Sequence, residues 1–528
     1  MNRNAGLRHG LFSVPITPGA VPEAGAPHRL GSWPQCIRKN ERGLSMNRWS
    51  CFLLALSLIG CARFESRPIT PSETAAALEG RRLDDAGLKK FLETNLGRAL
   101  EAWPLVSWDL KTLTLAALYF HPSLDLARVQ WQAAEAGVRT AGARPNPTLG
   151  LTPGYDTSAV NGLSPWIPFF NLDVPLETAG KRGHRVARAQ RLSQSARLNI
   201  ATVAWQVRSG VRANLLDFAT ANQRAILLEG QVAAQEQIVE RLEQRVAAGA
   251  ISRADVTAAR IALARSRLDL GGAKSKRAES RARLAESLGV SEGALAGVTL
   301  RFDFSERAAG ELTAADARNV ALRGRSDILG ALADYGAAEA ELRLQIARQY
   351  PDIHLNPGYQ FDQGDNKWTL GITFELPAFN QNQGPIAEAG ARREEAAARF
   401  TGLQAKVIGE IDRAVTAHSA ARDELAGTGE MLAAARQQLR SVEAQLKAGA
   451  ADPLDLLNAQ LELGVATLAR LEIQTRLEQS FGALEDALQR PIEATGGTSG
   501  TFSLYDTAQR APDRSTNSAG SDQPGGLR

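Results

Sequence analysis

The chain has 528 residues, and 61 Lys and Arg against 57 Asp and Glu give a formal net charge of +4. The two signs of charge interleave and only 6% of residues are aromatic, so the composition argues against a nucleic-acid partner. Proline is absent from residues 176–350 and 386–452. Because an interior proline breaks a helix, these stretches predict long uninterrupted helices.

The N-terminus predicts a segment that is removed before the protein reaches its destination. Residues 1–45 are rich in Pro and Gly and lack periodicity, so we interpret them as a start-site extension or a removed leader. We expect translation to begin at Met46. Residues 46–60 combine a positive start, a short apolar run and a small residue before the break, which is typical of an export signal.

Residues 58–61 resemble a bacterial lipobox, whose cysteine, Cys61, would carry lipid and become the mature N-terminus. An ordinary signal peptide followed by a chance cysteine is the alternative. Ala62 after the cysteine favours an outer-membrane destination. Removal of Cys36 and Cys51 with the signal would leave no disulfide and no thiol ligand in the mature chain.

Beyond a polar N-terminal segment, residues 61–104, the chain alternates apolar and polar residues in four short stretches. They are about residues 148–156, 167–176, 352–361 and 367–376. Stretches of about ten residues that are apolar on one side and polar on the other are the strand pattern of a membrane β-barrel. Aromatic residues near the strand ends predict an interfacial girdle: Trp166, Phe169, Tyr359 and Trp368. A soluble β-hairpin packed on helices would show a similar pattern.

The four stretches belong to an internal repeat. The residues at 133–136 and 147–155 return 204 positions later, and the Ala-Gly-Ala at 248–250 returns 200 positions later. Such self-similarity predicts a duplicated architecture. Four strands cannot close a barrel, because single-chain barrels start at about eight, and open strand edges are not tolerated in lipid. A membrane barrel would therefore need several copies of the chain.

Each strand pair is followed by a predicted helical hairpin, over about residues 181–288 and 386–490. Heptad spacing of apolar residues indicates coiled-coil packing. Each long helix breaks at Ala-Gly-Ala, and the returning helix begins at an N-cap residue, Ser252 or Asp452. The C-terminal tail, residues 494–528, is rich in Gly, Ser, Thr and Pro and predicts disorder.

Over residues 105–490 these features together resemble the TolC-like outer-membrane factor family, the exit ducts of bacterial efflux pumps. The resemblance implies a mainly α fold with membrane β structure. Three chains would form a 12-stranded outer-membrane β-barrel, continued by a long periplasmic α-helical coiled-coil barrel. Residues 175–182 resemble the strand-to-helix junction of the family's cation-efflux branch, which hints at metal-cation cargo.

The resemblance also implies roles at the periplasmic tips. Contacts with a periplasmic adaptor are expected at Gly249, Ala250, Ser252, Gly449 and Ala450. Asp255 and Asp455 are the gate candidates, so Asp455→Ala is expected to raise leakage. Two residues depart from the family pattern, Ala451 and Asn458, and a purely structural role for both aspartates in the first helical turn is the alternative.

No catalytic motif and no metal-ligand spacing is present in the sequence, so we expect neither an enzyme nor a cofactor or bound metal. We predict a passive, homotrimeric exit duct that contacts outer-membrane lipid. Its expected partners are a periplasmic membrane-fusion adaptor and an inner-membrane pump of the RND type. A lipid-anchored periplasmic coiled-coil adaptor or scaffold, and a type I secretion exit duct, are the alternatives.

Overall fold

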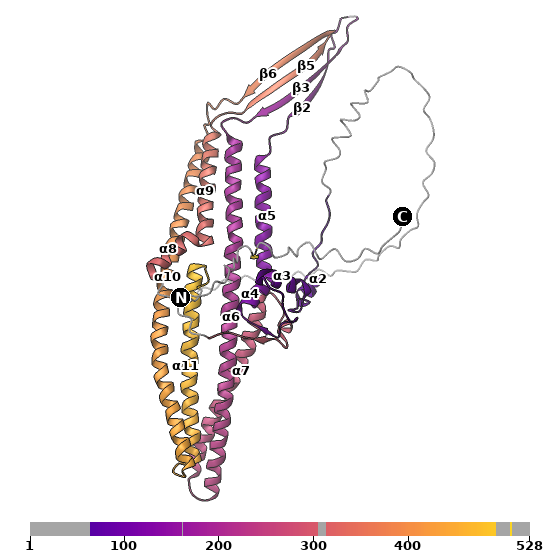
Figure 1. Ribbon diagram of the computed structural model, residues 1–528. Coiled ribbons are helices and arrows are strands. Elements are labelled where there is room, and N and C mark those ends of the chain that lie inside the picture. Colours follow the sequence, from indigo (N-terminus) through magenta and orange to yellow (C-terminus); the bar gives the residue numbers. More distant parts are fainter. Residues whose placement is uncertain (1–63, 161, 305–312, 493–506, 509–528) are drawn as a thin grey trace, which may run out of the picture. The chain divides into compact units, whose positions relative to one another are not determined.

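The computed structural model describes residues 64–160, 162–304, 313–492 and 507–508. The predicted leader, export signal and Cys61 lie outside these residues, as does most of the predicted tail. The chain divides into two units, Met1–Pro68 and Ile69–Arg528. The helices and strands given below belong to the second unit, which Figure 1 shows from its sheet to its helical turns.

The second unit is mostly helical. Its strands are β1 (Ser107–Trp108), β2 (Thr148–Tyr155), β3 (Trp166–Leu176), β4 (Thr299–Leu300), β5 (Ile353–Asp362) and β6 (Asp365–Phe374). Its short and middle-length helices are α2 (Pro71–Glu79), α3 (Ala86–Leu96), α4 (Leu110–Phe120), α5 (Pro122–Gly142), η1 (Glu292–Leu295), α8 (Ala314–Gly324) and α9 (Ser326–Ala347). Its long helices are α6 (Lys181–Ala247), α7 (Arg253–Leu288), α10 (Gln383–Lys447) and α11 (Pro453–Leu488).

Four strands form one antiparallel sheet in the order β2-β3-β5-β6. Each copy of the repeat supplies a hairpin, and the copies meet where β3 pairs with β5, with Phe170 opposite Tyr359 and Leu176 opposite Ile353. The predicted four strands per chain are thereby confirmed. β2 and β6 lie at the two edges of this sheet, so each pairs with one strand and its outer edge has no partner in the sheet.

The long helices form two antiparallel hairpins, α6 with α7 and α10 with α11. α6 and α10 run from the sheet end to the tips, and α7 and α11 return from the tips to mid-length (Figure 1). α6 has 67 residues and α10 has 65, so each is about 100 Å long at 1.5 Å per residue. α6 lies beside α9 in the upper half and beside α11 in the lower half. Among the described helices, none combines the length and the apolar character that a membrane span would require.

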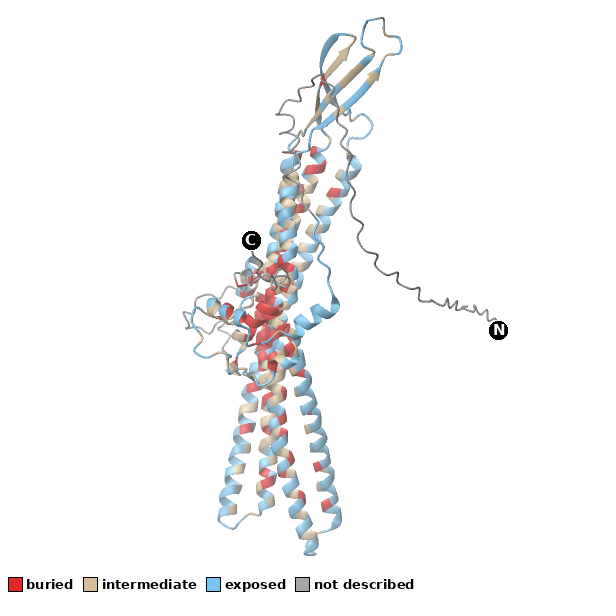
Figure 2. Cartoon of the chain, turned by 90° about the vertical axis from the view of Figure 1, so that its right-hand side faces the viewer, coloured by how far each residue is buried: buried red, intermediate tan, exposed pale blue. Residues whose placement is uncertain are grey.

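The largest hydrophobic core lies at mid-length, where α3, α4 and α5 pack against α6 and α7 (Figure 2). Leu88, Phe120 and Leu215 are almost completely buried there. Ala508, in the short described part of the tail, joins the same core, and its carbonyl accepts hydrogen bonds from Arg128 Nε and Nη2 at 2.8 and 2.6 Å. This core anchors the N-terminal segment to the first helical hairpin.

The duplicated halves share a junction in which a long helix ends against the start of a shorter one. In the first copy, Arg81 Nη1 donates to the carbonyls of Phe120 and Gly289 at 2.6 and 2.8 Å, joining the ends of α4 and α7. In the second copy, Arg325 Nη1 donates to Ala487 O at 2.8 Å, at the end of α11. Each arginine bonds carbonyls that a helix C-terminus leaves without an intrahelical partner.

A buried charged cluster joins α6 to α11 close to this level. Arg208 Nη2 lies 2.9 Å from Glu485 Oε2, and Arg212 Nη2 lies 3.3 Å from Glu478 Oε2. All four side chains are at most 10% exposed. Because buried charges are retained only when they are paired, these contacts determine how the two hairpins sit on each other.

Asp486 extends this cluster and gives it a dependence on pH. Its carboxylate accepts hydrogen bonds from Trp205 Nε1 at 2.9 Å and Ser209 Oγ at 2.5 Å. Burial raises the pKa of Asp486 above its ordinary value, against the lowering effect of these bonds and the nearby arginines. A raised folded-state pKa contributes stability that is present below the unfolded pKa and is lost as pH rises through the folded one.

Asp486→Asn removes this titration, because asparagine carries no proton to release. The variant should therefore gain stability relative to the wild type as the pH rises from about 4 to 7. Thermal unfolding of both proteins at the two pH values measures the difference. The prediction is contradicted if the stability of the wild type relative to Asp486→Asn increases as the pH rises.

Candidate membrane wall and hairpin tips

One face of the sheet is apolar and exposed. The alternating residues predicted for this face are more than half exposed at several positions: Leu149, Leu151, Tyr155, Trp166, Trp368, Leu370 and Ile372. The register places them side by side, since Leu149 pairs with Leu172, Leu355 with Ile372 and Pro357 with Leu370. A continuous exposed apolar surface of this kind is stable against lipid and unstable in water.

Aromatic side chains gather toward the hairpin ends of the strands. The rings of Tyr155 and Trp166 lie 5.0 Å apart, and those of Tyr359 and Trp368 lie 4.8 Å apart. The ring of Phe170 on β3 lies 6.4 Å from that of Tyr359 and extends the second pair by one ring. The predicted girdle residues Trp166, Tyr359 and Trp368 thus lie in two separate aromatic groups. Phe169, in contrast, packs close to Gly358 on the opposite face.

The opposite face of the sheet is mostly polar, with Ile167 and Phe169 as apolar exceptions toward the outer end of β3. Asn356 Nδ2 donates to Thr373 Oγ1 at 3.1 Å across β5 and β6, and His354 Nδ1 lies 2.9 Å from Asp173 Oδ1 across β5 and β3. Successive side chains of a strand point to opposite faces of the sheet, so the alternating apolar and polar residues of the sequence separate into one apolar and one polar face. The sheet can therefore separate an apolar surrounding from an aqueous interior.

The strand-to-helix junction is held by polar bonds between the two repeats. Lys181 Nζ lies 2.7 Å from Asp352 Oδ1, and the Thr178 backbone N–H donates to the same oxygen at 2.9 Å. Burial raises the pKa of Asp352, but the bonds from Lys181 and Thr178 outweigh it and hold the pKa below its ordinary value. Asp352 is therefore ionised at neutral pH and orients the start of α6.

The two hairpin tips have the same backbone geometry. Gly249 and Gly449 have φ of +72° and +74°, which is the left-handed conformation that glycine adopts without steric cost. The backbone N–H groups of Ala250 and Ala450 donate at 2.8 Å to carbonyls five residues earlier, which completes a Schellman motif at each tip. Gly249, Ala250, Ser252, Gly449 and Ala450 are all exposed or close to the tip surface.

Asp255 and Asp455 occupy equivalent positions in capping boxes. Asp255 Oδ2 accepts from the Ser252 backbone N–H at 3.1 Å and from Ser252 Oγ at 2.8 Å. Asp455 Oδ2 accepts from the Asp452 backbone N–H at 2.9 Å. Within the single chain, both carboxylates thus stabilise the first turn of their own helix, and neither reaches the other hairpin.

The contact between the two tips is made by a pair that the sequence did not suggest. Arg245, in the last turn of α6, forms an ion pair with Asp452, the N-cap of α11. The two residues are 207 positions apart, so no local pattern in one sequence could have identified them as partners. Asp452 therefore both pairs with Arg245 and caps α11, because its other oxygen accepts a hydrogen bond from the Leu454 backbone N–H at 3.1 Å.

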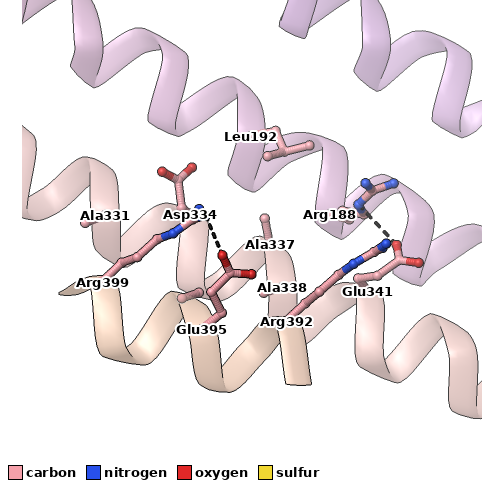
Figure 3. Close-up of a pocket in the computed structure, with 11 residues that line it drawn as sticks. Arg188, Leu192, Ala331, Asp334, Ala337, Ala338, Glu341, Arg392, Glu395 and Arg399 are labelled. Carbon is pink, nitrogen blue, oxygen red and sulfur yellow. Dashed lines mark hydrogen bonds and ion pairs between the residues drawn. The ribbon is translucent and has the colours of Figure 1, made fainter. Parts of the chain in front are cut away.

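A groove of about 390 Å³ lies among α6, α9 and α10 below the sheet (Figure 3). Its charged side chains are largely paired: Arg188 lies 3.1 Å from Glu341, and Arg399 lies 2.5 Å from Glu395. With the charges balanced, the groove favours no particular class of ligand. In the part of the chain that the structure describes, no group of three or more His, Cys, Asp or Glu is positioned to hold a metal ion.

An exposed apolar sheet continued by long helical hairpins defines the protomer of an outer-membrane channel. The family model described as "outer membrane efflux protein" matches residues 115–290 and 317–489, one stretch for each copy of the repeat. The chain belongs to this family. It is an outer-membrane efflux channel protein, and the prediction that it is a passive duct rather than an enzyme is confirmed.

Individual relatives agree with this assignment. The chain is 25% identical over 372 residues to the cobalt-zinc-cadmium resistance protein CzcC of Cupriavidus metallidurans, covering 70% of this chain and 87% of CzcC. The outer membrane protein VceC of Vibrio cholerae superposes with a TM-score of 0.58 at 23% identity, covering 73% of this chain and 97% of VceC. CusC superposes with a TM-score of 0.60 at 19% identity, covering 74% and 95%. These two superpositions establish the shared fold.

Proposed function

We propose that three copies of this chain assemble into a closed channel that crosses the outer membrane and extends into the periplasm. The observation that carries the proposal is the exposed apolar face of a sheet whose two edge strands, β2 and β6, each leave their outer edge unpaired in the sheet. Strand direction alternates through the sheet, so β6 of one copy and β2 of the next would pair antiparallel. Three copies give twelve strands, above the roughly eight that a closed membrane barrel requires.

The mass of the purified assembly tests this step. Protein extracted in detergent should have the protein mass of three chains after the detergent contribution is subtracted. A chain that stays monomeric, or that remains in aqueous solution without detergent, would contradict the closed barrel.

The same proposal assigns partners to the two ends. Lipidation of Cys61 would anchor the N-terminus in the outer membrane, and a periplasmic membrane-fusion adaptor would dock on the tips around Gly249, Ala250, Ser252, Gly449 and Ala450. An inner-membrane pump, of the RND type, would supply the energy and select the cargo. Cross-linking from cysteine at Ser252 to a co-expressed adaptor tests the docking, with exposed Lys276 far from the tip as the control position.

Divalent metal cations are the proposed cargo. The support is the likeness to CzcC, whose name states cobalt, zinc and cadmium resistance and which this chain covers over 87% of its length. Deletion of the gene in its host should lower the tolerated concentrations of cobalt, zinc or cadmium and leave tolerance of apolar drugs unchanged. Drug sensitivity with unchanged metal tolerance would assign the channel to a drug pump instead.

The Arg245–Asp452 ion pair is the proposed latch of the closed tip, with Asp255 and Asp455 maintaining the turns on either side. Arg245→Met should raise the conductance of the isolated channel in planar bilayers, because it frees the two hairpins from each other. Asp455→Ala should raise it as well, since the capping box at Asp452 is lost with it.

Arg260→Met is the matched control for the latch. Arg260 pairs with Glu243 at 2.6 Å, but this pair joins α6 to α7 within one hairpin and does not bridge the two tips. Its loss should leave the conductance at the wild-type value. Equal conductance in the wild type, Arg245→Met and Asp455→Ala would refute the latch.

A further inference from the structure

The polar face of the sheet carries few charged residues. At the outer end, Lys367 pairs with Asp362 at 2.5 Å near the hairpin turn, where Asp365 lies opposite Asp362. At the end nearest the helices, the charged groups of the strands are Asp173 on β3 and His354 on β5. The positions between these ends on that face are uncharged: Gly150, Thr152, Phe169, Asn171, Asn356, Gly358, Gln360, Thr369 and Gly371. Asp173 and His354 are therefore isolated along the wall from other charged strand residues.

The two side chains form a direct pair that remains open to solvent. His354 Nδ1 lies 2.9 and 3.1 Å from the two oxygens of Asp173. A carboxylate only accepts hydrogen bonds, so Nδ1–H is the donor. The side chains are 40% and 31% exposed for His354 and Asp173, respectively. Ions in a central channel could thus approach the pair, whose charge is −1 with neutral histidine and zero with protonated histidine.

Other charged groups close to the pair come from each neighbouring element. Asp352 precedes β5, but its charge is balanced by the ammonium of Lys181 on α6 at 2.7 Å. Glu375 follows β6 and is exposed, and Glu177 after β3 is paired with Arg185. Asp173 therefore supplies a negative charge that no lysine or arginine on these elements neutralises within ion-pair distance, and His354 is its direct partner.

We propose that the Asp173–His354 pair is a charge filter of the channel, which favours cations and weakens as His354 gains a proton. The inference rests on the proposed closed assembly, in which the polar face lines the interior and three pairs form a ring. Rings of charged side chains set ion preference in pores. A protonated imidazole beside the carboxylate cancels its charge, so each pair in the ring contributes no net charge once His354 is protonated.

Reversal potentials of the purified full-length channel in planar bilayers, under a gradient of potassium chloride, test the filter. Low salt is needed, because the screening length is only about 10 Å at 0.1 M. The wild type should prefer potassium over chloride at about pH 7.5 and lose part of that preference at about pH 5. Asp173→Asn should lower the preference at the higher pH, and His354→Gln should keep it at both.

Asn356→Ser is the matched control, because Asn356 lies on the same strand and face as His354 and carries no charge. It should behave as the wild type. Channels that conduct in both Asp173→Asn and His354→Gln with wild-type selectivity and wild-type pH dependence would overturn the filter and leave the proposed duct intact. A preparation in which even the wild type forms no channel would overturn the duct, and the filter with it.

Discussion

Arg212→Met should destabilise the folded protein by about 3–5 kcal/mol, the range measured when one partner of a buried ion pair is removed. The guanidinium of Arg212 lies 3.3 Å from Glu478 Oε2 and 3.7 Å from Glu485 Oε2, and its Nη2 donates to the Glu478 carbonyl at 2.7 Å. Methionine keeps part of the volume and leaves two carboxylates in the interior with less compensation. Urea unfolding followed by the helical circular-dichroism signal measures the loss.

Arg224→Met is the control on the same pair of helices. Arg224 on α6 contacts Glu472 on α11 at 2.6 Å, but the two side chains are 46% and 57% exposed. Solvent weakens such a pair, so its removal should cost no more than about 1 kcal/mol. Equal effects of the two substitutions would mean that burial does not govern the contact between α6 and α11.

Leu370→Arg should abolish stable insertion of the channel into the outer membrane. Leu370 is 72% exposed on the apolar face of β6, where a closed barrel meets lipid. An arginine near the bilayer midplane of a barrel costs about 2–4 kcal/mol, and a trimer would bear that cost three times. The amount of protein in the outer-membrane fraction, and its mobility as an assembly without heating, report the effect.

Thr369→Arg is the neighbouring control, because Thr369 lies on the polar face of the same strand opposite Gly358. An arginine there can extend into the aqueous interior, so the assembly should persist while the ion preference shifts. If the Leu370→Arg protein still assembles in the outer membrane and the Thr369→Arg protein does not, the assignment of the two faces is reversed. That result would place the polar face against lipid.

Local sequence determined much of the fold. The apolar alternation at residues such as Leu149 and Leu370 identified the strands, and the Ala-Gly-Ala turns with Ser252 and Asp452 identified the ends of the helices. These features depend on residues a few positions apart, since strand periodicity, left-handed glycine and helix caps are properties of short segments. The repeat at a spacing of about 200 residues then indicated that both halves share one architecture.

The tertiary structure alone decided which distant residues meet. The sequence identified Asp255 and Asp455, but the pair that joins the tips is Arg245 with Asp452. The cluster of Arg208 and Arg212 with α11 and the contact of His354 with Asp173 likewise carried no local signature. Partners such as these lie about 180 to 280 positions apart, and their contact depends on how whole helices and strands pack. Nothing in the residues flanking one charged side chain specifies which opposite charge the folded chain will bring beside it.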